Sequence, residues 1–198
     1  MNKVNQFFAV SAIVAAFTAG NAVAATSAPV AGGIVTFNGA VSDTTCNVTT
    51  NNGADFTVNV APVAKSDLGT TVGVVSASAT PFTLNVSGCT GFDATSTAAQ
   101  SLDIAFSGSN VSDDMKYLKN ESGTAQGVGI AITSDGSQVV NMGTAMATGL
   151  KTTQSGSTVY DTGAEGVINL YANYYNYGGA SASTGSVVTT ATYTFSYE

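Results

Sequence analysis

Apolar residues alternate with polar ones through most of the chain beyond residue 54, and this period of two restricts the fold more than any other property. Successive side chains of a strand point to opposite faces, so the pattern predicts strands with one buried face. Gly, Ser, Asn, Asp or Pro bounds each instance, as in strands joined by turns. The alternating apolar positions are Phe56, Val58, Val60, Phe82, Leu84, Val86, Leu102, Ile104, Phe106, Val128, Ile130, Ile132, Ile168, Leu170, Ala172 and Tyr174.

Helical periodicity is weak throughout this part of the sequence. No segment sustains an apolar stripe with a period of 3.6 residues, and β-branched residues and turn formers fill most of the chain. We therefore predict an all-β domain, an antiparallel sandwich of the immunoglobulin-like or a related type. The spans 107–126 and 143–166 are the least regular and are expected to form loops or short edge strands.

The C-terminal segment from Gly185 onward has the most regular alternation. One phase carries Val187, Thr189, Ala191, Tyr193, Phe195 and Tyr197. With no strand after it, this last strand is expected to need a cover on one of its edges.

The first residues have the pattern of a secretory signal. Lys3 precedes an apolar run from Phe7 to Phe17, and the small-residue site Ala22-Val23-Ala24 follows. We predict a signal peptide over residues 1–24 and export of the remaining 174 residues, a length suited to one domain. The apolar run is too short for a stable membrane anchor.

A second apolar row follows the predicted cleavage site. Val35, Phe37, Gly39 and Val41 share one side of an extended chain. These residues could form the first strand of the chain's own sheet or fill the core of another molecule, and the alternation alone does not separate the two.

Composition excludes several function classes. The chain has no histidine and no arginine, and its formal net charge is −7, which argues against nucleic acid or an anionic membrane as a partner. Cys46 and Cys89 are the only cysteines, and in an exported chain they are expected to form one disulfide rather than a metal site. Catalytic pairs that use histidine are absent, so we predict neither an enzyme nor a cofactor.

Two clusters offer alternatives. The adjacent carboxylates of Asp113 and Asp114 fall in a Ser/Asn/Asp-rich stretch and are expected to be a solvated turn rather than a glycosidase pair. In "YANYYNY", Tyr171, Tyr175 and Tyr177 lie opposite the Ile168/Leu170 face. Their rings could stack on sugars and make the chain a carbohydrate-binding module, or they could be a half-buried strand face or a subunit contact.

Taken together, the motifs resemble the subunits of chaperone-usher pili, most closely the major subunits of type 1-like fimbriae. The matching features, in order along the chain, are the signal peptide, "GG" at Gly32 and Gly33, "VTFNGAV" before Cys46, "FTLNVSGC" up to Cys89, and "GSVVTTATYTFSYE". In the last motif Gly185 stands fourteenth from the end and Tyr197 is the penultimate residue. The resemblance covers essentially the whole chain.

This resemblance implies an incomplete immunoglobulin-like sandwich, the pilin fold, which lacks its last strand. It implies a signal peptide at 1–24, an N-terminal donor-strand extension at 25–43 and a pilin domain at 44–198. Val35, Phe37, Gly39 and Val41 of one subunit would complete the next, after a periplasmic chaperone and an outer-membrane usher have handled it. Gly185, Tyr193, Phe195 and Tyr197 would form the strand that borders the groove and meets the chaperone. The expected product is a polymer of identical or related subunits, a cell-surface fimbria that serves adhesion, with a host glycan or receptor as a further partner.

Overall fold

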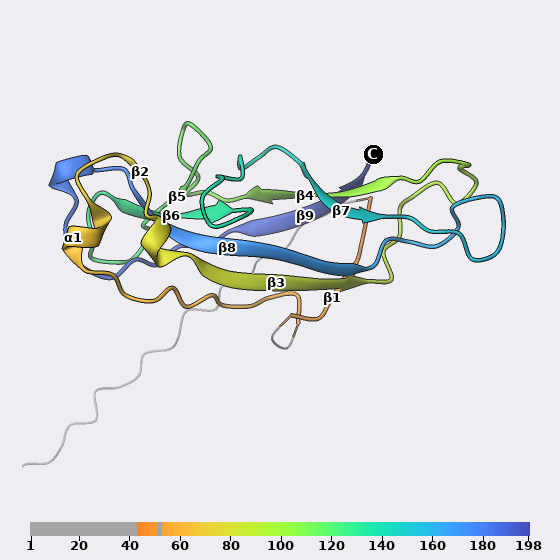
Figure 1. Ribbon diagram of the computed structural model, residues 1–198, viewed down its shortest axis with the longest axis horizontal. Helices are drawn as coiled ribbons and strands as arrows, with labels where there is room; N and C mark the ends of the chain where they lie inside the picture. Colours follow the sequence, from red (N-terminus) through yellow and green to blue (C-terminus); the bar gives the residue numbers. More distant parts are fainter. Residues whose placement is uncertain (1–42, 51–52) are drawn as a thin grey trace, which may run out of the picture. The chain divides into compact units, whose positions relative to one another are not determined.

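The computed structural model describes residues 43–50 and 53–198 as two antiparallel β-sheets (Figure 1). The larger sheet has the strand order β1-β3-β8-β6-β5, and β2 also pairs with β8. Its strands are β1 (Asn47–Val48), β2 (Gly73–Val74), β3 (Thr80–Ser87), β5 (Leu118–Lys119), β6 (Val128–Thr133) and β8 (Gly166–Asn176). The smaller sheet has the order β7-β4-β9, from β4 (Ser101–Ser107), β7 (Met146–Lys151) and β9 (Thr192–Tyr197).

Helical structure is brief in the described residues. It comprises α1 (Lys65–Leu68) and two 3₁₀ turns, η1 (Ser76–Ser78) and η2 (Gly179–Ser181). No helix in this part of the chain is both long and apolar enough to cross a membrane. The prediction of an all-β antiparallel domain with little helix is confirmed, and the two irregular spans contain the short strand β5 and the edge strand β7, as predicted.

The apolar phases of β3 and β8 meet because of their register. Phe82 pairs with Leu170 and Leu84 with Ile168, so both apolar rows leave the sheet on the same face. On the other flank of β8, Ile132 of β6 pairs with Ala172. This inner face faces the smaller sheet.

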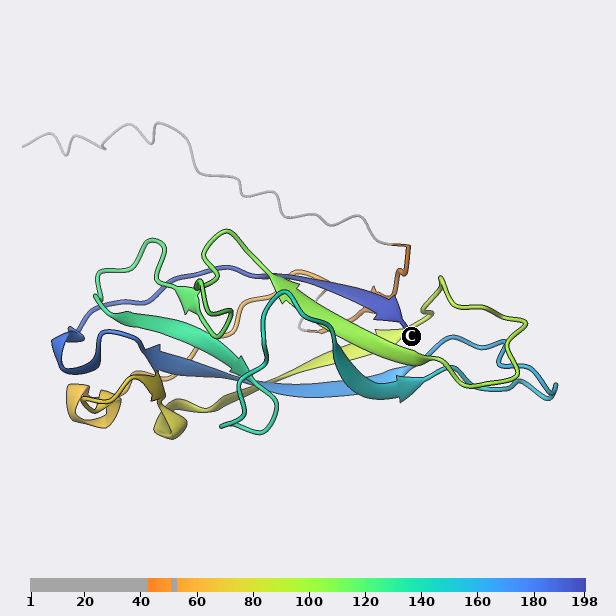
Figure 2. The ribbon, with the colours of Figure 1, turned by 90° about the horizontal axis from the view of Figure 1, so that it is seen from above.

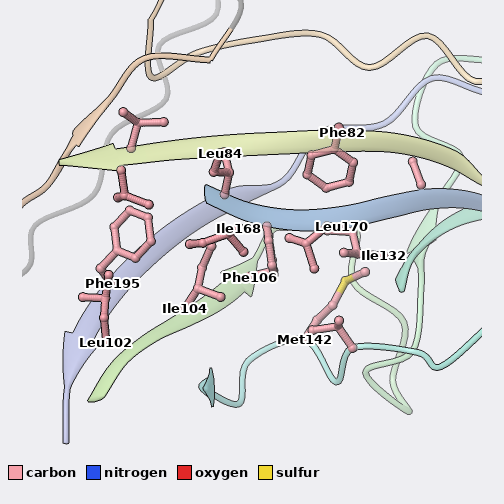
Figure 3. Close-up of a cluster of buried hydrophobic side chains, with 14 of the residues drawn as sticks. Phe82, Leu84, Leu102, Ile104, Phe106, Ile132, Met142, Ile168, Leu170 and Phe195 are labelled. Carbon is pink, nitrogen blue, oxygen red and sulfur yellow. The ribbon is translucent and has the colours of Figure 1, made fainter. Parts of the chain in front are cut away.

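The core lies between the two sheets (Figure 3). Leu84 of β3 and Leu170 of β8 are almost fully buried against Leu102 and Ile104 of β4, and Met142, from the segment before β7, is fully buried too. Burial of each such side chain stabilises the fold by about 1.5 to 3 kcal/mol. The alternating residues of the sequence thus form one core shared by both sheets.

Two buried asparagines on β8 form hydrogen bonds to neighbouring loops. The Asn173 side chain accepts a hydrogen bond from Thr133 Oγ1 (2.8 Å) and donates one to the Gly136 carbonyl (3.1 Å). The Asn176 amide donates to the carbonyls of Leu68, Gly69 and Gly179, each at 3.2 Å. Buried amides need such partners, so these contacts fix the loops against the sheet.

Candidate functional site

An open groove of about 850 Å³ runs between two extended segments of the chain. Its floor is the hydrophobic core itself, since Phe82, Phe106, Ile132 and Ala172 line it. One border is residues 54–60, here called the near edge, and the other is residues 187–195, here called the far edge. Among the residues that the structure describes, no strand therefore covers this part of the apolar core.

The near edge has the side-chain pattern of a strand but not its hydrogen bonds. Phe56, Val58 and Val60 are half-buried, and the residues between them are exposed. Among the described residues, no main-chain group of the near edge takes part in a backbone hydrogen bond. The alternation predicted a strand here, and the structure differs because no described strand lies beside this segment to form a ladder.

The far edge pairs on one side. Its C-terminal part is β9, which pairs antiparallel with β4 so that Phe195 lies opposite Ile104. Figure 2 shows β9 and β7 as the two outer strands of the smaller sheet, with β4 between them. No described strand pairs with the other side of β9, so the predicted need for a cover on this edge corresponds to the groove.

The strand predicted from Gly185 onward is shorter in the structure. β9 begins at Thr192, whereas Val187 and Thr189 continue the half-buried phase without a sheet partner. Val188 bonds to a loop instead, because its N–H donates to Asn120 Oδ1 (2.9 Å) and its carbonyl accepts from Glu121 N–H (2.8 Å). Periodicity indicates which way side chains point. It does not indicate whether a neighbouring strand forms backbone hydrogen bonds with the segment.

Of the residues predicted for the groove strand, Tyr193 and Phe195 lie on the far edge and line the groove, whereas Gly185 precedes this edge and Tyr197 follows it. Phe195 is 6% exposed, while Tyr193 and Tyr197 are half-buried, and the Tyr197 hydroxyl accepts a hydrogen bond from Ala164 N–H (2.8 Å). Gly185 precedes them with a φ of +150°, and a Cβ there would overlap the Ala125 main chain. Glycine is thus required at this position by both conformation and close approach.

Two tyrosine hydroxyls reach the near edge from the sheets. Tyr193 donates to the Ala54 carbonyl at 2.7 Å, and Tyr174 of β8 lies 3.4 Å from the Val60 carbonyl. Burial raises the pKa of both tyrosines above the usual value of 10.0, and for Tyr193 the Asp55 charge adds to the effect. Both hydroxyls are therefore protonated donors at neutral pH.

The predicted disulfide is present between Cys46 and Cys89. It joins the residue before β1 to the segment just after β3, with the sulfurs packed against the core. Beside it, a Cβ at Gly91 would overlap the main chain of Asp43 and Thr44, so Gly91 allows these segments to touch. The bond fixes the point at which the chain enters the described domain.

The donor-strand residues Val35, Phe37, Gly39 and Val41 lie outside the described residues, as does the predicted signal peptide at 1–24. Their roles stay predictions. The same holds for the division at residues 43 and 44, where the description begins.

Of the tyrosines of "YANYYNY", Tyr171 and Tyr175 lie on the outer face of β8 and Tyr177 directly follows the strand, whereas Tyr174 faces the groove. Tyr117 stacks on Tyr175 with ring centroids 4.5 Å apart and on Tyr177 at 4.9 Å. Tyr175 is only 6% exposed, and Tyr171 and Tyr177 are half-buried. The glycan contact stays an untested prediction, and its direct test is binding of a glycan array by wild type against a Tyr175→Ala variant.

Asp113 and Asp114 each lie beside a lysine a few residues further along the chain. Asp114 lies 3.3 Å from Lys116 and Asp113 lies 3.4 Å from Lys119. A hydrogen bond from the Ser112 hydroxyl is the main cause that lowers the Asp114 pKa below 3.8. Within residues 43–50 and 53–198, no three His, Cys, Asp or Glu side chains gather as metal ligands would.

Two features of this site could not be predicted from the sequence. Residues 54–60 were predicted to be an ordinary strand, and Tyr117 was not linked to the tyrosines of β8. The first had no signal in the sequence, because Phe56, Val58 and Val60 alternate as in any half-buried strand. Tyr117 had none either, since its contacts span more than fifty residues of sequence.

Comparison with known proteins identifies the class. The family model described as fimbrial protein matches residues 35–198. The major fimbrial subunit SMF-1 of Stenotrophomonas maltophilia (strain K279a) is 33% identical over 197 residues, which cover 89% of this chain and 98% of that protein.

Among solved structures, a chain in the structure of a chaperone-usher pilus that reveals the molecular basis of rod uncoiling matches with a TM-score of 0.52 and 23% identity. That match covers 86% of this chain and 98% of the other, and it supports the fold. The P pilus rod subunit PapA is also similar, at 20% identity and a TM-score of 0.46 over 83% of this chain and all of PapA. The relative SMF-1 is a fimbrial subunit rather than an enzyme, and the match of the family model over residues 35–198 shows that this chain belongs to the fimbrial protein family, whose members are subunits of cell-surface pili.

Proposed function

We propose that the open groove accepts residues 35–41 of a second subunit as a β-strand, and that subunits join head to tail into a fimbria in this way. The groove carries the proposal, because its floor is the apolar core, two extended segments border it, and no main-chain group of the near edge forms a backbone hydrogen bond among the described residues. Strand addition suits such a site: main-chain hydrogen bonds supply affinity, and alternate side chains in pockets supply specificity.

The apolar row of the extension matches the chemistry of the groove. Burial of Val35, Phe37 and Val41 would contribute about 1.5 to 3 kcal/mol each, or roughly 5 to 9 kcal/mol before the cost of ordering the segment. Gly39 would allow close approach to a bulky group in the groove. Because a subunit can leave only by withdrawing a whole strand, the polymer should be kinetically stable.

The route to the fibre follows from the family. The chain is exported through the periplasm, where Cys46 and Cys89 are oxidised, and a chaperone strand occupies the groove first. Tyr193, Phe195 and Tyr197 border the chaperone strand, and the Glu198 carboxylates pair with basic residues of the chaperone. At the outer-membrane usher the extension of the next subunit replaces that strand, and the finished fibre serves attachment.

The first experiment uses the mature chain without residues 25–41, with a synthetic peptide of that segment added in trans. We expect the truncated chain to bind the peptide and its melting temperature to rise with peptide concentration. A stable truncated monomer whose melting temperature ignores the peptide would refute the proposal.

The second experiment places a charge in the apolar row. Phe37→Asp should abolish the polymer, because an uncompensated carboxylate would enter the apolar groove. Thr36→Asp is the matched control, since residue 36 has the opposite phase and the same charge would stay in solvent. Polymers of normal length from Phe37→Asp would count against the assigned row.

A further inference from the structure

We propose that Tyr174 and Tyr193 are positioning residues for strand acceptance, whose hydroxyl groups hold the near edge at the spacing that an inserted strand requires. This inference rests on the proposed function of the open groove. Both side chains form hydrogen bonds to the near edge, although periodicity alone assigns them to the apolar core.

The near edge depends on side chains for its position. In the described part of the chain it has no backbone hydrogen bond to either sheet. Phe56 packs on Phe82 with ring centroids 5.9 Å apart and on Tyr193 at 6.4 Å, and such apolar contacts are not directional. The directional contacts of its main chain are the two bonds from Tyr193 and Tyr174.

These bonds lie at the two ends of the near edge. Ala54 and Val60 are six residues apart, which in an extended chain is roughly 20 Å. Val35 and Val41 are also six residues apart, so the inserted row and the segment between the two bonds have the same length. The hydroxyls therefore restrain the segment of the near edge along which Val35 to Val41 of a second subunit would lie.

The two carbonyls also share a direction. Main-chain groups of residues an even number apart point to the same side of an extended strand, so Ala54, Phe56, Val58 and Val60 turn their carbonyls the same way. The bonds to tyrosines that line the groove show that this side is the groove side. The hydroxyls thus orient the acceptors that the inserted strand would use.

The hydroxyls reach these carbonyls from inward-facing side chains, Tyr174 on β8 and Tyr193 on the far edge. Tyr193 shares the inward phase of the buried Phe195, and Tyr174 shares that of the buried Ala172. A carbonyl has two lone pairs, so each can keep its tyrosine partner while it accepts an N–H from an inserted strand. The link is compatible with an occupied groove.

Removal of the hydroxyls alone tests the role. Tyr193→Phe, Tyr174→Phe and the double variant keep the ring contacts, which for Tyr193 include Phe106 and Phe195. The probe is a fluorescent synthetic peptide of residues 29–43, bound to the full mature chain. Tyr160→Phe is the control, because Tyr160 is a half-buried tyrosine that does not line the groove.

We expect the peptide Kd to rise about fivefold in Tyr193→Phe, the usual effect of one net hydrogen bond, and about twofold to threefold in Tyr174→Phe, whose bond is longer. The double variant should show about the product, and the control no change. ¹⁵N relaxation should show lower order parameters for residues 55–60 in the double variant, with those of β3 and β8 unchanged.

The outcomes separate the two proposals. If wild type and variants bind the peptide equally and the order parameters of residues 55–60 do not change, the positioning role is wrong and the function of the groove stands. If wild type neither forms polymers nor binds the peptide, the proposed function fails, and the positioning role fails with it. A loss of affinity with equal losses of order in β3 and β8 would also overturn the role, because it would indicate general destabilisation.

Discussion

Removal of the Cys46–Cys89 disulfide should be the most destabilising change at the start of the domain. The bond closes a sequence separation of 43 residues. In the chain-entropy model, release of a loop of this length costs about 4 kcal/mol of stability, because the unfolded chain regains the conformations that the bond excluded. The double variant Cys46→Ala/Cys89→Ala avoids a free thiol, and we expect it to lose about that amount.

Urea denaturation of the purified mature chain measures the effect. For a domain of this size m is about 2 kcal/mol per molar urea, so the midpoint should fall by about 2 M. Thr45→Ala is the matched control. It removes a surface contact in which the Thr45 and Thr90 hydroxyls lie 2.9 Å apart but leaves the loop closed, and it should cost no more than about 1 kcal/mol.

The size of the midpoint shift decides the outcome. A shift of less than about 0.5 M at unchanged m would refute the reasoning, because the bond would then not restrict the unfolded chain as calculated. A lower m in the double variant would instead indicate that the folded or unfolded state had changed in compactness.

Three further predictions concern the core, the outer face and pH. Ile104→Ala should cost about 3 to 4 kcal/mol in urea denaturation, because Ile104 is fully buried, and a loss below 1 kcal/mol would contradict the core assignment. Tyr117→Ala should cost about 1 to 2 kcal/mol through its two ring stacks, whereas Tyr160→Ala should cost less. Stability should be flat between about pH 5 and 9, because the chain has no histidine. The free energy of unfolding should fall as pH rises beyond 10.0, because a raised tyrosine pKa favours the folded state only while the hydroxyl stays protonated. The tyrosines with a raised pKa are Tyr117, Tyr174, Tyr193 and Tyr197. A loss of stability between pH 7 and 9 would contradict this prediction.

Local periodicity predicted the faces of the strands well. The apolar phases of β3, β4, β6 and β8 enter the core as the alternation indicated, although Ile130 and Tyr174 are only half-buried. A period of two follows from the geometry of each strand by itself, so it can be seen without knowledge of the neighbours. The disulfide could also be predicted from the sequence, because the chain has only two cysteines.

Only part of the candidate site could be predicted from the sequence. The C-terminal motif predicted the strand of the far edge, in which Tyr193 and Phe195 line the groove, whereas Tyr197 lies beyond it. The near edge was missed because Phe56, Val58 and Val60 have the same alternation as any half-buried strand. What distinguishes this segment is the lack of a backbone ladder within the described residues, and such a ladder forms with residues distant in sequence.

The outer tyrosines depend most strongly on tertiary structure. Gly129 of β6 lies between Tyr117 and β8, and a Cβ there would be 3.1 Å from the Tyr117 ring and would overlap the Leu118 carbonyl. Its bare backbone lets the Tyr117 ring cross β6 and contact Tyr175 and Tyr177. No spacing in the sequence indicates this contact.

The amino-acid sequence by itself determined the all-β class, the inward face of each principal strand, the disulfide and the family, because these depend on local alternation, on residue counts and on ordered motifs. Only the tertiary structure decided which strands are neighbours, where the described residues leave a groove over the core, and that two tyrosine hydroxyls link the near edge to the sheets. The physical reason is that side-chain direction is a property of one segment, whereas ladders, grooves and cross-sheet hydrogen bonds are properties of segments that meet only in the folded chain.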